Sequence, residues 1–257
     1  MRASQRANEM ARCASLFGQS LVSGQPVSEL LPSRLAVTGE LIFLAFFVSL
    51  LIAIPVALLA ARRPNGVVDR ISMFIGTTGL SVANYVLALV LVLIFAVELG
   101  WLPAIGYQPL SAGLWANLET MILPSAAIGI PLFCFYGRFL RSDLVDQMQG
   151  EDYITTAHAK GLGPWQVLVR HAFRNSSFGL ITVVGLNLGT LIGGTVIIEQ
   201  IFALPGLGQL LLQSINTRDF VVVLAAVVIF AVVAVLANLI VDLLYAVLDP
   251  RIRYGSH

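Results

Sequence analysis

Five runs of the sequence contain no Asp, Glu, Lys or Arg over a length that can cross a lipid bilayer. They are residues 41–61, 71–97, 120–137, 175–198 and 220–241. A helix rises about 1.5 Å per residue, so about 20 residues cover a hydrocarbon core of about 30 Å. Of the 257 residues, 58% are hydrophobic and 11% are charged, which excludes an ordinary soluble domain. We therefore expect an all-α, polytopic membrane helical bundle with five spans.

The distribution of Lys and Arg between the loops predicts how this bundle lies in the membrane. One set of loops, with the tail, carries ten of these residues, whereas the loops 98–119 and 199–219 carry only Arg218. The ten are Arg62, Arg63, Arg70, Arg138, Arg141, Lys160, Arg170, Arg174, Arg251 and Arg253. Cytoplasmic loops retain Lys and Arg during insertion. We therefore expect a multi-pass protein of the plasma (inner) membrane, with an external amino terminus and a cytoplasmic carboxy terminus.

This orientation divides the chain into three parts. We expect residues 1–36 to form an external amino-terminal segment, residues 37–248 a transmembrane domain with a cytoplasmic elbow at 138–175, and residues 249–257 a cytoplasmic tail. The external segment carries four Arg residues and no apolar run that resembles a signal peptide. Two explanations stay open: the amino terminus is translocated without a signal, or an earlier span is absent from this chain.

The cytoplasmic elbow has the pattern of two short helices joined by a turn. Asp152 is suited to cap a first helix that runs through Ala159, and Gly161 tolerates the positive φ at which many helices end. Pro164 suits the first turn of a second helix that reaches about Arg174. The pattern predicts a helix–turn–helix element on the cytoplasmic face.

The second elbow helix carries a positive face. Arg170 and Arg174 are four residues apart, so they share one side of a helix, with His171 close by. A solvated face on the positive side of the membrane explains these residues as well as a docking surface for a cytoplasmic partner does. Both interpretations stay open from the residues alone.

Small residues in the fourth span indicate close helix packing. Gly185, Gly189 and Gly193 are spaced four apart, which favours packing within the bundle over a subunit interface. Asn187 lies among them and Asn238 lies in the fifth span. For both we favour hydrogen bonding between helices over a place in a water-filled path.

The outer segment 201–213 is apolar but too short to span. Pro205, Gly206 and Gly208 interrupt it, which predicts a turn followed by a short helix. This element either lines the outer mouth of a transport path or forms a packed external cap.

The chain lacks the motifs of enzymes and nucleotide-binding proteins. It has no HExxH, no GxSxG and no Gly-rich Walker loop, since Lys160 is its only lysine. Its three His residues have no spacing suited to a shared metal, and a net charge of +1 gives no basic surplus for nucleic acid. We expect no catalytic residues, no metal, no bound cofactor and no nucleic-acid partner.

The five span cores also lack ionisable residues. Secondary transporters and ion channels more often bury such residues at mid-membrane to couple charge to transport. Together with the structured elbow, this favours a membrane subunit driven by a separate motor.

Residues 152–175, DYITTAHAKGLGPWQVLVRHAFRN, resemble the ATPase-coupling loop of binding-protein-dependent ABC importers, in particular of the dipeptide and oligopeptide branch. That branch typically reads D-Y-[VI]-x-T-A-x-A-K-G-L followed by R-H-A-x-x-N. Shorter stretches agree elsewhere, namely GQPVSELLPSRL, LGWLPAIG, RFLRS, EQIFALPGLGQLL and DLLYAVLDPRIR. The resemblance covers about residues 16–254 and suits the first of the two permease types that pair in these systems.

The resemblance implies a type I-like transmembrane domain and a set of partners. Such a subunit pairs in the lipid membrane with a homologous second permease, with two cytoplasmic ATPase subunits that hydrolyse ATP, and with an external solute-binding protein. It would bind no cofactor itself and form half of a path for short peptides. Members are also associated with nickel, glutathione and other small solutes.

The same resemblance assigns a coupling role to the elbow. Thr155, Thr156 and Ala157 occupy the positions of the general family's Glu-Ala-Ala motif. Thr155 departs from this motif, since it stands where the motif has Glu. Small side chains at Ala157, Ala159 and Gly161 would let the first elbow helix seat in a cleft of the ATPase, while basic residues of the second helix meet acidic groups. The coupling residues implied are Asp152, Tyr153, Thr155, Thr156, Ala157, Ala159, Lys160, Gly161, Arg170, His171 and Arg174.

Two features depart from the branch. Its members usually begin with one more span and then an external stretch, and residues 1–36 resemble that stretch, so we expect a truncation or a mis-chosen start. A proline that commonly follows R-H-A-x-x-N is replaced near Gly179. The alternative hypothesis is a truncated, inactive or scaffold membrane subunit.

Overall fold

The computed structural model describes residues 18–248, which fold into helices with one isolated bridge between Gln19 and Pro26. In chain order the elements are α2 (Val27–Arg62), α3 (Val67–Ser81), α4 (Asn84–Leu91), the π-helix η1 (Val92–Glu98), the 3-10 helix η2 (Leu110–Ala112), α5 (Leu114–Gly150), α6 (Asp152–Ala159), α7 (Pro164–Val167), the π-helix η3 (Leu168–Ala172), α8 (Phe173–Ile201), α9 (Leu207–Asn216) and α10 (Phe220–Leu248). The predicted tail, 249–257, and the first 17 residues of the predicted external segment lie outside the described residues.

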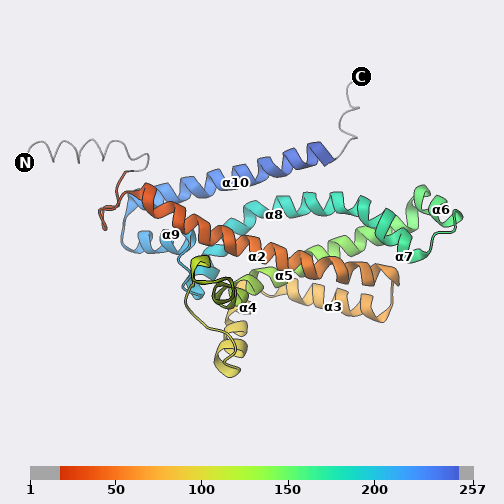
Figure 1. Ribbon diagram of the computed structural model, residues 1–257, viewed down its shortest axis with the longest axis horizontal. Helices are drawn as coiled ribbons and strands as arrows, with labels where there is room; N and C mark the ends of the chain where they lie inside the picture. The colour runs from red at the N-terminus through yellow and green to blue at the C-terminus, as the bar shows by residue number, and fades with distance from the viewer. Residues whose placement is uncertain (1–17, 249–257) are drawn as a thin grey trace, which may run out of the picture.

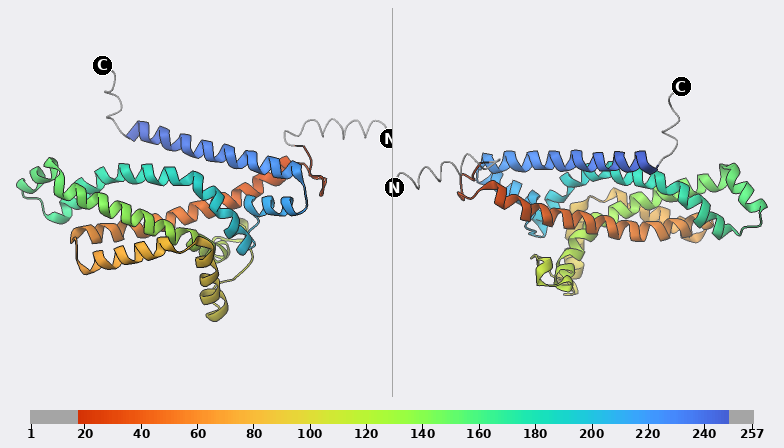
Figure 2. Two further views of the ribbon diagram at one scale, coloured as in Figure 1. Left: turned by 180° about the vertical axis from the view of Figure 1, so that it is seen from behind. Right: turned by 45° about the horizontal axis from the view of Figure 1, so that its top comes forward.

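The long helices α2, α5, α8 and α10 run along the long axis of the molecule (Figure 1). The start of α2, α9 and the start of α10 lie at one end, and α6 and α7 lie at the other, as the two further views in Figure 2 also show. Helices α2, α5 and the stretch Phe220–Ile240 of α10 are each long and apolar enough to cross a membrane, and two bent pairs bring the total to five if each pair is one span. The predicted all-α, polytopic bundle is confirmed.

Helices α2 and α5 cross at small residues in the centre of the core. A Cβ added to Gly129 of α5 would lie 3.1 Å from the carbonyl oxygen of Ala45 in α2, and one added to Gly137 would lie 3.9 Å from Ala53. Ala45 and Ala53 are themselves fully buried. Small residues on both helices let the two backbones approach closely. The helix that leads into the elbow is therefore packed tightly against α2.

The second predicted span, 71–97, is not one straight helix. α3 ends at Ser81, and α4 with η1 continues after a break at an angle of 103°. The backbone of Val82 and Ala83 is extended, so the helical hydrogen bonds stop there. Figure 1 shows α4 pointing away from the long axis. An apolar run predicts an apolar environment but not the direction of a helix, which is why the sequence did not predict the bend.

Two helices extend beyond their predicted spans. α2 begins at Val27, inside the segment 1–36 that the sequence separated from the transmembrane domain. α5 continues to Gly150, so the elbow starts after this residue and not at the first charged residue beyond the third span. Leu140 and Leu144 are fully buried one helical turn apart on this extension. Their burial explains why the helix continues although its surface has become polar.

Candidate functional site

The first elbow helix, α6, begins at Asp152, the residue that was predicted to cap it. The amide N–H groups of Ile154 and Thr155 donate to the carbonyl oxygen of Glu151 at 3.1 and 3.4 Å. Glu151 is therefore the residue that precedes the helix, since the cap residue accepts its first backbone bonds. Asp152, predicted as the cap, is instead the first helical residue. Its negative charge there suits the positive end of the helix dipole.

The turn after α6 depends on Gly161, whose φ is 80°. The N–H of Leu162 donates to the carbonyl of Ala157 at 3.3 Å, and the N–H of Lys160 donates to the carbonyl of Thr156 at 3.1 Å. A bond over this span around a left-handed residue is the Schellman ending of a helix. Side chains with a Cβ are strained at such a φ. Gly161 thus fixes the direction in which the chain leaves α6, as the sequence predicted.

The second arm of the elbow is continuous with the fourth span. Helix α7 begins at Pro164 and passes through η3 into α8, which starts at Phe173. The predicted end near Arg174 is wrong, because no proline or left-handed residue interrupts the helix there. Arg170 and Arg174 are both exposed and His171 is half-buried. The π-helix that contains Arg170 alters the 3.6-residue spacing that was expected to align the two Arg side chains.

One side-chain oxygen joins the elbow to the helices on either side of it. The hydroxyl of Tyr153 in α6 donates to Oε1 of Gln147 in α5 at 2.6 Å, and Nδ2 of Asn175 in α8 donates to the same oxygen at 2.9 Å. Burial and the negative charges of Glu151 and Asp143 raise the pKa of Tyr153, so its hydroxyl remains a donor at neutral pH. The sequence did not single out Gln147, since one glutamine carries no signal for partners on two other helices.

The end of α2 also contacts the elbow. The guanidinium carbon of Arg62 lies 5.7 Å from the centroid of the Trp165 ring in α7. A cation–π contact at an exposed site contributes about 0.5–1 kcal/mol. The sequence assigned Arg62 to the positive loop and gave no sign of this aromatic partner.

The predicted coupling residues of α6 divide into an outward and an inward set. Ala157 is 5% exposed and belongs to the core together with Ile154, three residues before it. The prediction that Ala157 seats α6 in a cleft of the ATPase is therefore wrong. Its small side chain instead lets α6 pack against its own chain. The predicted residues that are exposed are Asp152, Tyr153, Thr155, Thr156, Ala159, Lys160 and Gly161.

The three glycines of the fourth span were predicted to share one helical face. In the structure they do not lie on one straight face. α8 bends by 65° between the stretch that ends at Gly189 and the stretch that begins at Gly193. A Cβ on Gly189 would lie 3.8 Å from the side-chain amide of Asn238 in α10, whereas a Cβ on Gly193 would meet nothing within 4 Å. Gly185 is buried. Close packing between helices therefore holds at Gly189 and not at Gly193.

The residues considered for a path or outer mouth are mostly inside the protein. Asn187 is half-buried, and its Nδ2 donates to the carbonyl of Val183 within α8 at 2.8 Å. Pro205 is half-buried, and Gly206 and Gly208 are buried. Of the two interpretations of this outer turn, the burial favours the packed cap.

The turn packs around a buried carboxyl group that the sequence did not single out. Glu199 is fully buried, and Thr38 Oγ1 of α2 donates to its Oε1 at 2.7 Å. The N–H of Gln209 donates to Glu199 Oε2 at 3.0 Å, and the N–H of Leu207 donates to Thr38 Oγ1 at 2.9 Å. A Cβ on Gly206 would overlap the Glu199 carboxyl group. The glycine is required there by the approach of the backbone to this side chain.

Comparison with known proteins identifies the family. Residues 53–254 match the profile of the family described as "Binding-protein-dependent transport system inner membrane component". The chain belongs to this family. The oligopeptide transport system permease protein AppB of Bacillus subtilis (strain 168) is 39% identical over 241 residues, which are 93% of this chain and 76% of that protein. The glutathione transport system permease protein GsiC of Salmonella choleraesuis (strain SC-B67) is 39% identical over 238 residues, 93% of this chain and 75% of that protein.

Solved structures confirm the fold of this permease. A chain of the MetNI methionine ABC transporter in an inward-facing conformation superimposes with a TM-score of 0.68 at 20% identity, covering 87% of this chain and 98% of that one. An amino acid ABC transporter with histidines gives a TM-score of 0.63 at 16% identity, covering 85% and 94%. The permease therefore has the fold of ABC transporter transmembrane subunits and is a multi-pass membrane protein.

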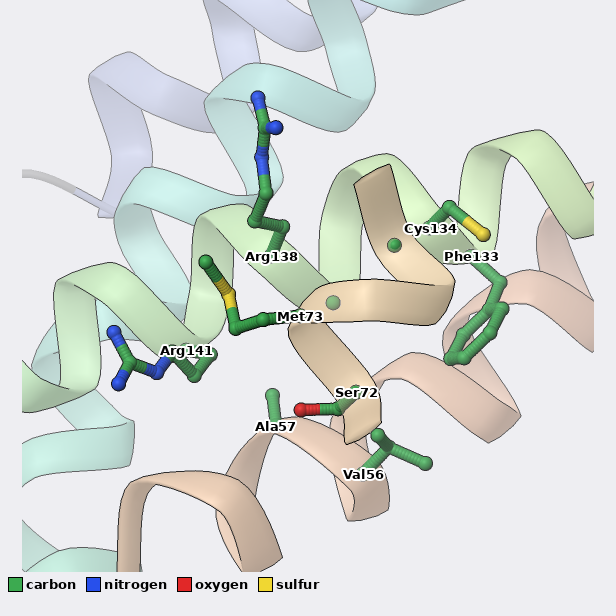
Figure 3. A pocket seen from close by; sticks show the side chains of 10 residues that line it. Val56, Ala57, Ser72, Met73, Phe133, Cys134, Arg138 and Arg141 are labelled. Atoms are coloured by element: carbon green, nitrogen blue, oxygen red, sulfur yellow. The ribbon is translucent and has the colours of Figure 1, made fainter. Parts of the chain in front are cut away.

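The permease also has an ion pair near the elbow end that the sequence did not predict. Nε and Nη2 of Arg141 in α5 donate to the two carboxylate oxygens of Asp69 in α3, at 2.7 and 2.6 Å. A small crevice lies beside this pair, and residues of α2, α3 and α5 line it (Figure 3). Where the structure describes the side chains, no group of three or more His, Cys, Asp or Glu could hold a metal ion.

Proposed function

We propose that this permease forms half of the membrane path of an ATP-driven importer of short peptides. A homologous second permease would supply the other half, two cytoplasmic ATPase subunits would hydrolyse ATP, and an external solute-binding protein would deliver the peptide. Family membership and the named functions of AppB and GsiC support this proposal. The chain itself would bind no cofactor, because the ATPase subunits and not the permease would hydrolyse ATP.

The elbow is the element that we assign to ATPase docking. α6 is a short helix at the end of the bundle farthest from α9, and its outward residues are small or polar (Figure 1). The Gln147 oxygen and the buried Ile154 attach it to this chain's own helices. A force on α6 would therefore reach α5 and α8 and not merely bend a loop.

We infer the orientation of the permease from the distribution of Lys and Arg between its loops. Ten Lys and Arg residues lie on the side of the elbow and the tail, against one in the two opposite loops. The positive-inside rule places this side in the cytoplasm. The elbow would then face the ATPases, and the outer turn around Glu199 would face the solute-binding protein.

Short peptides are the substrate class that the relatives favour. One relative is named for oligopeptides and another for glutathione, which is itself a short peptide. Nickel and other small solutes remain alternatives, and the binding protein is expected to set much of the selectivity. Competition of labelled dipeptide uptake by unlabelled dipeptide, glutathione and nickel would identify the substrate.

Docking of the elbow can be tested with one exposed residue of α6. Ala159→Trp adds bulk at an exposed helical position, so the fold of the chain should not change. We expect the variant to reach the membrane in normal amounts while the ATPase subunits no longer copurify and ATP-dependent peptide uptake is lost. Asn216→Trp is the matched control for copurification of the ATPase subunits, because Asn216 is exposed at the end of α9, near the other end of the bundle.

Three results would count against the proposal. Normal copurification and uptake with Ala159→Trp would rule out this docking face. Peptide uptake that persists without any ATPase subunit would favour a secondary transporter, and a wild-type complex that assembles but never transports would favour a scaffold or an inactive subunit.

A further inference from the structure

The Asp69–Arg141 pair fixes the position of α3 along α5. Asp69 is 3% exposed, and both of its oxygens accept bonds from the Arg141 guanidinium. Such two-point pairing fixes orientation as well as distance. Asp69 Oδ2 also accepts the N–H of Asn65 at 2.8 Å, so the same carboxylate holds the turn between α2 and α3. It is the one ion pair among the side chains that the structure describes.

Besides this pair, the contact between α3 and α5 includes small residues and one weak hydrogen bond, which the Cys134 thiol donates to the carbonyl oxygen of Ile75 at 3.7 Å. Gly76 and Gly79 of α3 face Cys134 of α5, and an added Cβ at Gly79 would overlap the Cys134 sulfur. Small residues let two helix backbones approach closely, and a thiol is only a weak donor. The two-point ion pair is therefore the strongest polar contact between α3 and α5. A small crevice lined by Met73 lies between the same helices, and Figure 3 shows Arg138 and Arg141 leaving α5 in different directions around it.

Arg141 lies close to the part of α5 that holds the elbow. It precedes Gln147 by six residues, which is roughly 9 Å along a helix. Gln147 accepts the hydrogen bonds from Tyr153 of α6 and Asn175 of α8. A displacement of α6 therefore reaches Arg141 through one continuous helix, and Arg141 is bonded to the first turn of α3.

We propose that Asp69 and Arg141 are positioning residues that pass movement of the elbow from α5 to α3, and so keep ATP hydrolysis coupled to transport. This inference rests on the proposed function. Without the pair, the ATPases would still dock on α6 and hydrolyse ATP, while α3 and the bent α4 that follows it would no longer move in step. A buried charge without its partner is also strongly destabilising, so the test must separate coupling from folding.

The first experiment measures uptake and ATP hydrolysis in the complete importer, reconstituted in proteoliposomes with both permeases, the ATPases and the binding protein. We expect Asp69→Asn and Arg141→Gln to keep most of the ATPase activity while peptide taken up per ATP falls about fivefold or more, the range typical of coupling between sites. The exchange Asp69→Arg with Arg141→Asp should restore part of the peptide uptake per ATP. Arg141→Lys should give an uptake per ATP between those of the wild type and Arg141→Gln, because Lys keeps the charge but not the two-point geometry.

A second experiment does not depend on the exchange variant folding well. Spin labels at the exposed positions 77 in α3 and 149 in α5 report the distance between the two helices, after replacement of Cys13 and Cys134. In the wild-type importer this distance should stay constant when ATP binds, because the pair moves both helices together. In Asp69→Asn it should change on ATP binding.

The outcomes separate this inference from the proposed function. Loss of uptake and ATPase activity in equal proportion, or an unchanged ratio in Asp69→Asn, would overturn the coupling role and leave the importer assignment standing. The coupling role would also be overturned if ATP binding changed the α3–α5 distance equally in the wild type and in Asp69→Asn. Absence of ATP-driven uptake in the wild-type complex would instead overturn the proposed function.

Discussion

Glu199 at the end of α8 accepts a hydrogen bond of 2.7 Å from Thr38 of α2, although 161 residues separate them in the chain. Both side chains are buried. The N–H of Gln209 completes the site, so the carboxyl group lies at the amino-terminal end of α9, where the helix dipole favours negative charge. Three helices thus meet at one side chain, at the end of the bundle opposite α6 and α7.

Removal of the Thr38 hydroxyl should destabilise this junction. Thr38→Val keeps the shape of the side chain but leaves Glu199 Oε1 and the N–H of Leu207 without their partner. An unsatisfied buried polar group costs about 1–3 kcal/mol, and more when it is charged. We expect a lower Tm for the purified permease in detergent.

The control for this substitution is Thr77→Val. The Thr77 hydroxyl is exposed and donates only to the carbonyl of Met73 in its own helix. Its loss should change stability by no more than about 0.5 kcal/mol. Equal Tm values for the two variants would show that the Thr38 bond contributes little.

A methyl group at Gly208 should disturb the same junction by steric overlap. A Cβ there would lie 2.6 Å from the Cα of Val196 in α8, which is backbone and cannot rotate away. Overpacking of a tight interior costs about 1–3 kcal/mol. Gly208→Ala should therefore lower the amount of folded permease in membranes and its Tm.

Gly193→Ala is the matched control on α8. Nothing lies within 4 Å of a Cβ at Gly193, and alanine is a better helix former than glycine by about 1 kcal/mol. This variant should be at least as stable as the wild type. If Gly208→Ala behaved in the same way, α9 would have to be more loosely packed than the structure indicates.

Protonation of Asp219 should release the segment that precedes α2. Ser20 donates to Asp219 across 199 residues of sequence. Burial alone would raise the pKa of Asp219, but bonds from Ser20 and from the amides of Leu21, Val222 and Val22 outweigh it and hold this pKa below its ordinary value. A lowered pKa stabilises the folded state above the ordinary value of about 3.9, and this contribution is lost as the pH falls through the folded value.

Hydrogen exchange measures this dependence. Protection of the amides of residues 18–26, corrected for the intrinsic exchange rate, should be constant from neutral pH to about pH 4 and fall below it. Ser20→Ala should raise the pKa of Asp219 and move the fall to higher pH. Ser33→Ala, which removes only a bond to Leu30 in its own helix, should not move it. Identical profiles for both variants would contradict the role of Ser20.

Local patterns in the sequence predicted the elbow better than its surroundings. The turn at Gly161 that follows α6 and the start of α7 at Pro164 are both present in the structure, because each depends on the φ preference of one residue. The inward direction of Ala157 was missed. Which side of an eight-residue helix faces its own chain depends on the helices around it, and a short sequence pattern does not contain them.

The sequence by itself determined that the chain is a multi-pass helical membrane protein, since apolar length and the absence of charge are properties of continuous segments. Only the tertiary structure decided the bend after Ser81 and the pairing of Glu199 with Thr38 and of Asp69 with Arg141. The partners in these pairs are 161 and 72 residues apart. Packing of whole helices brings them together, and no local preference of the backbone encodes that meeting.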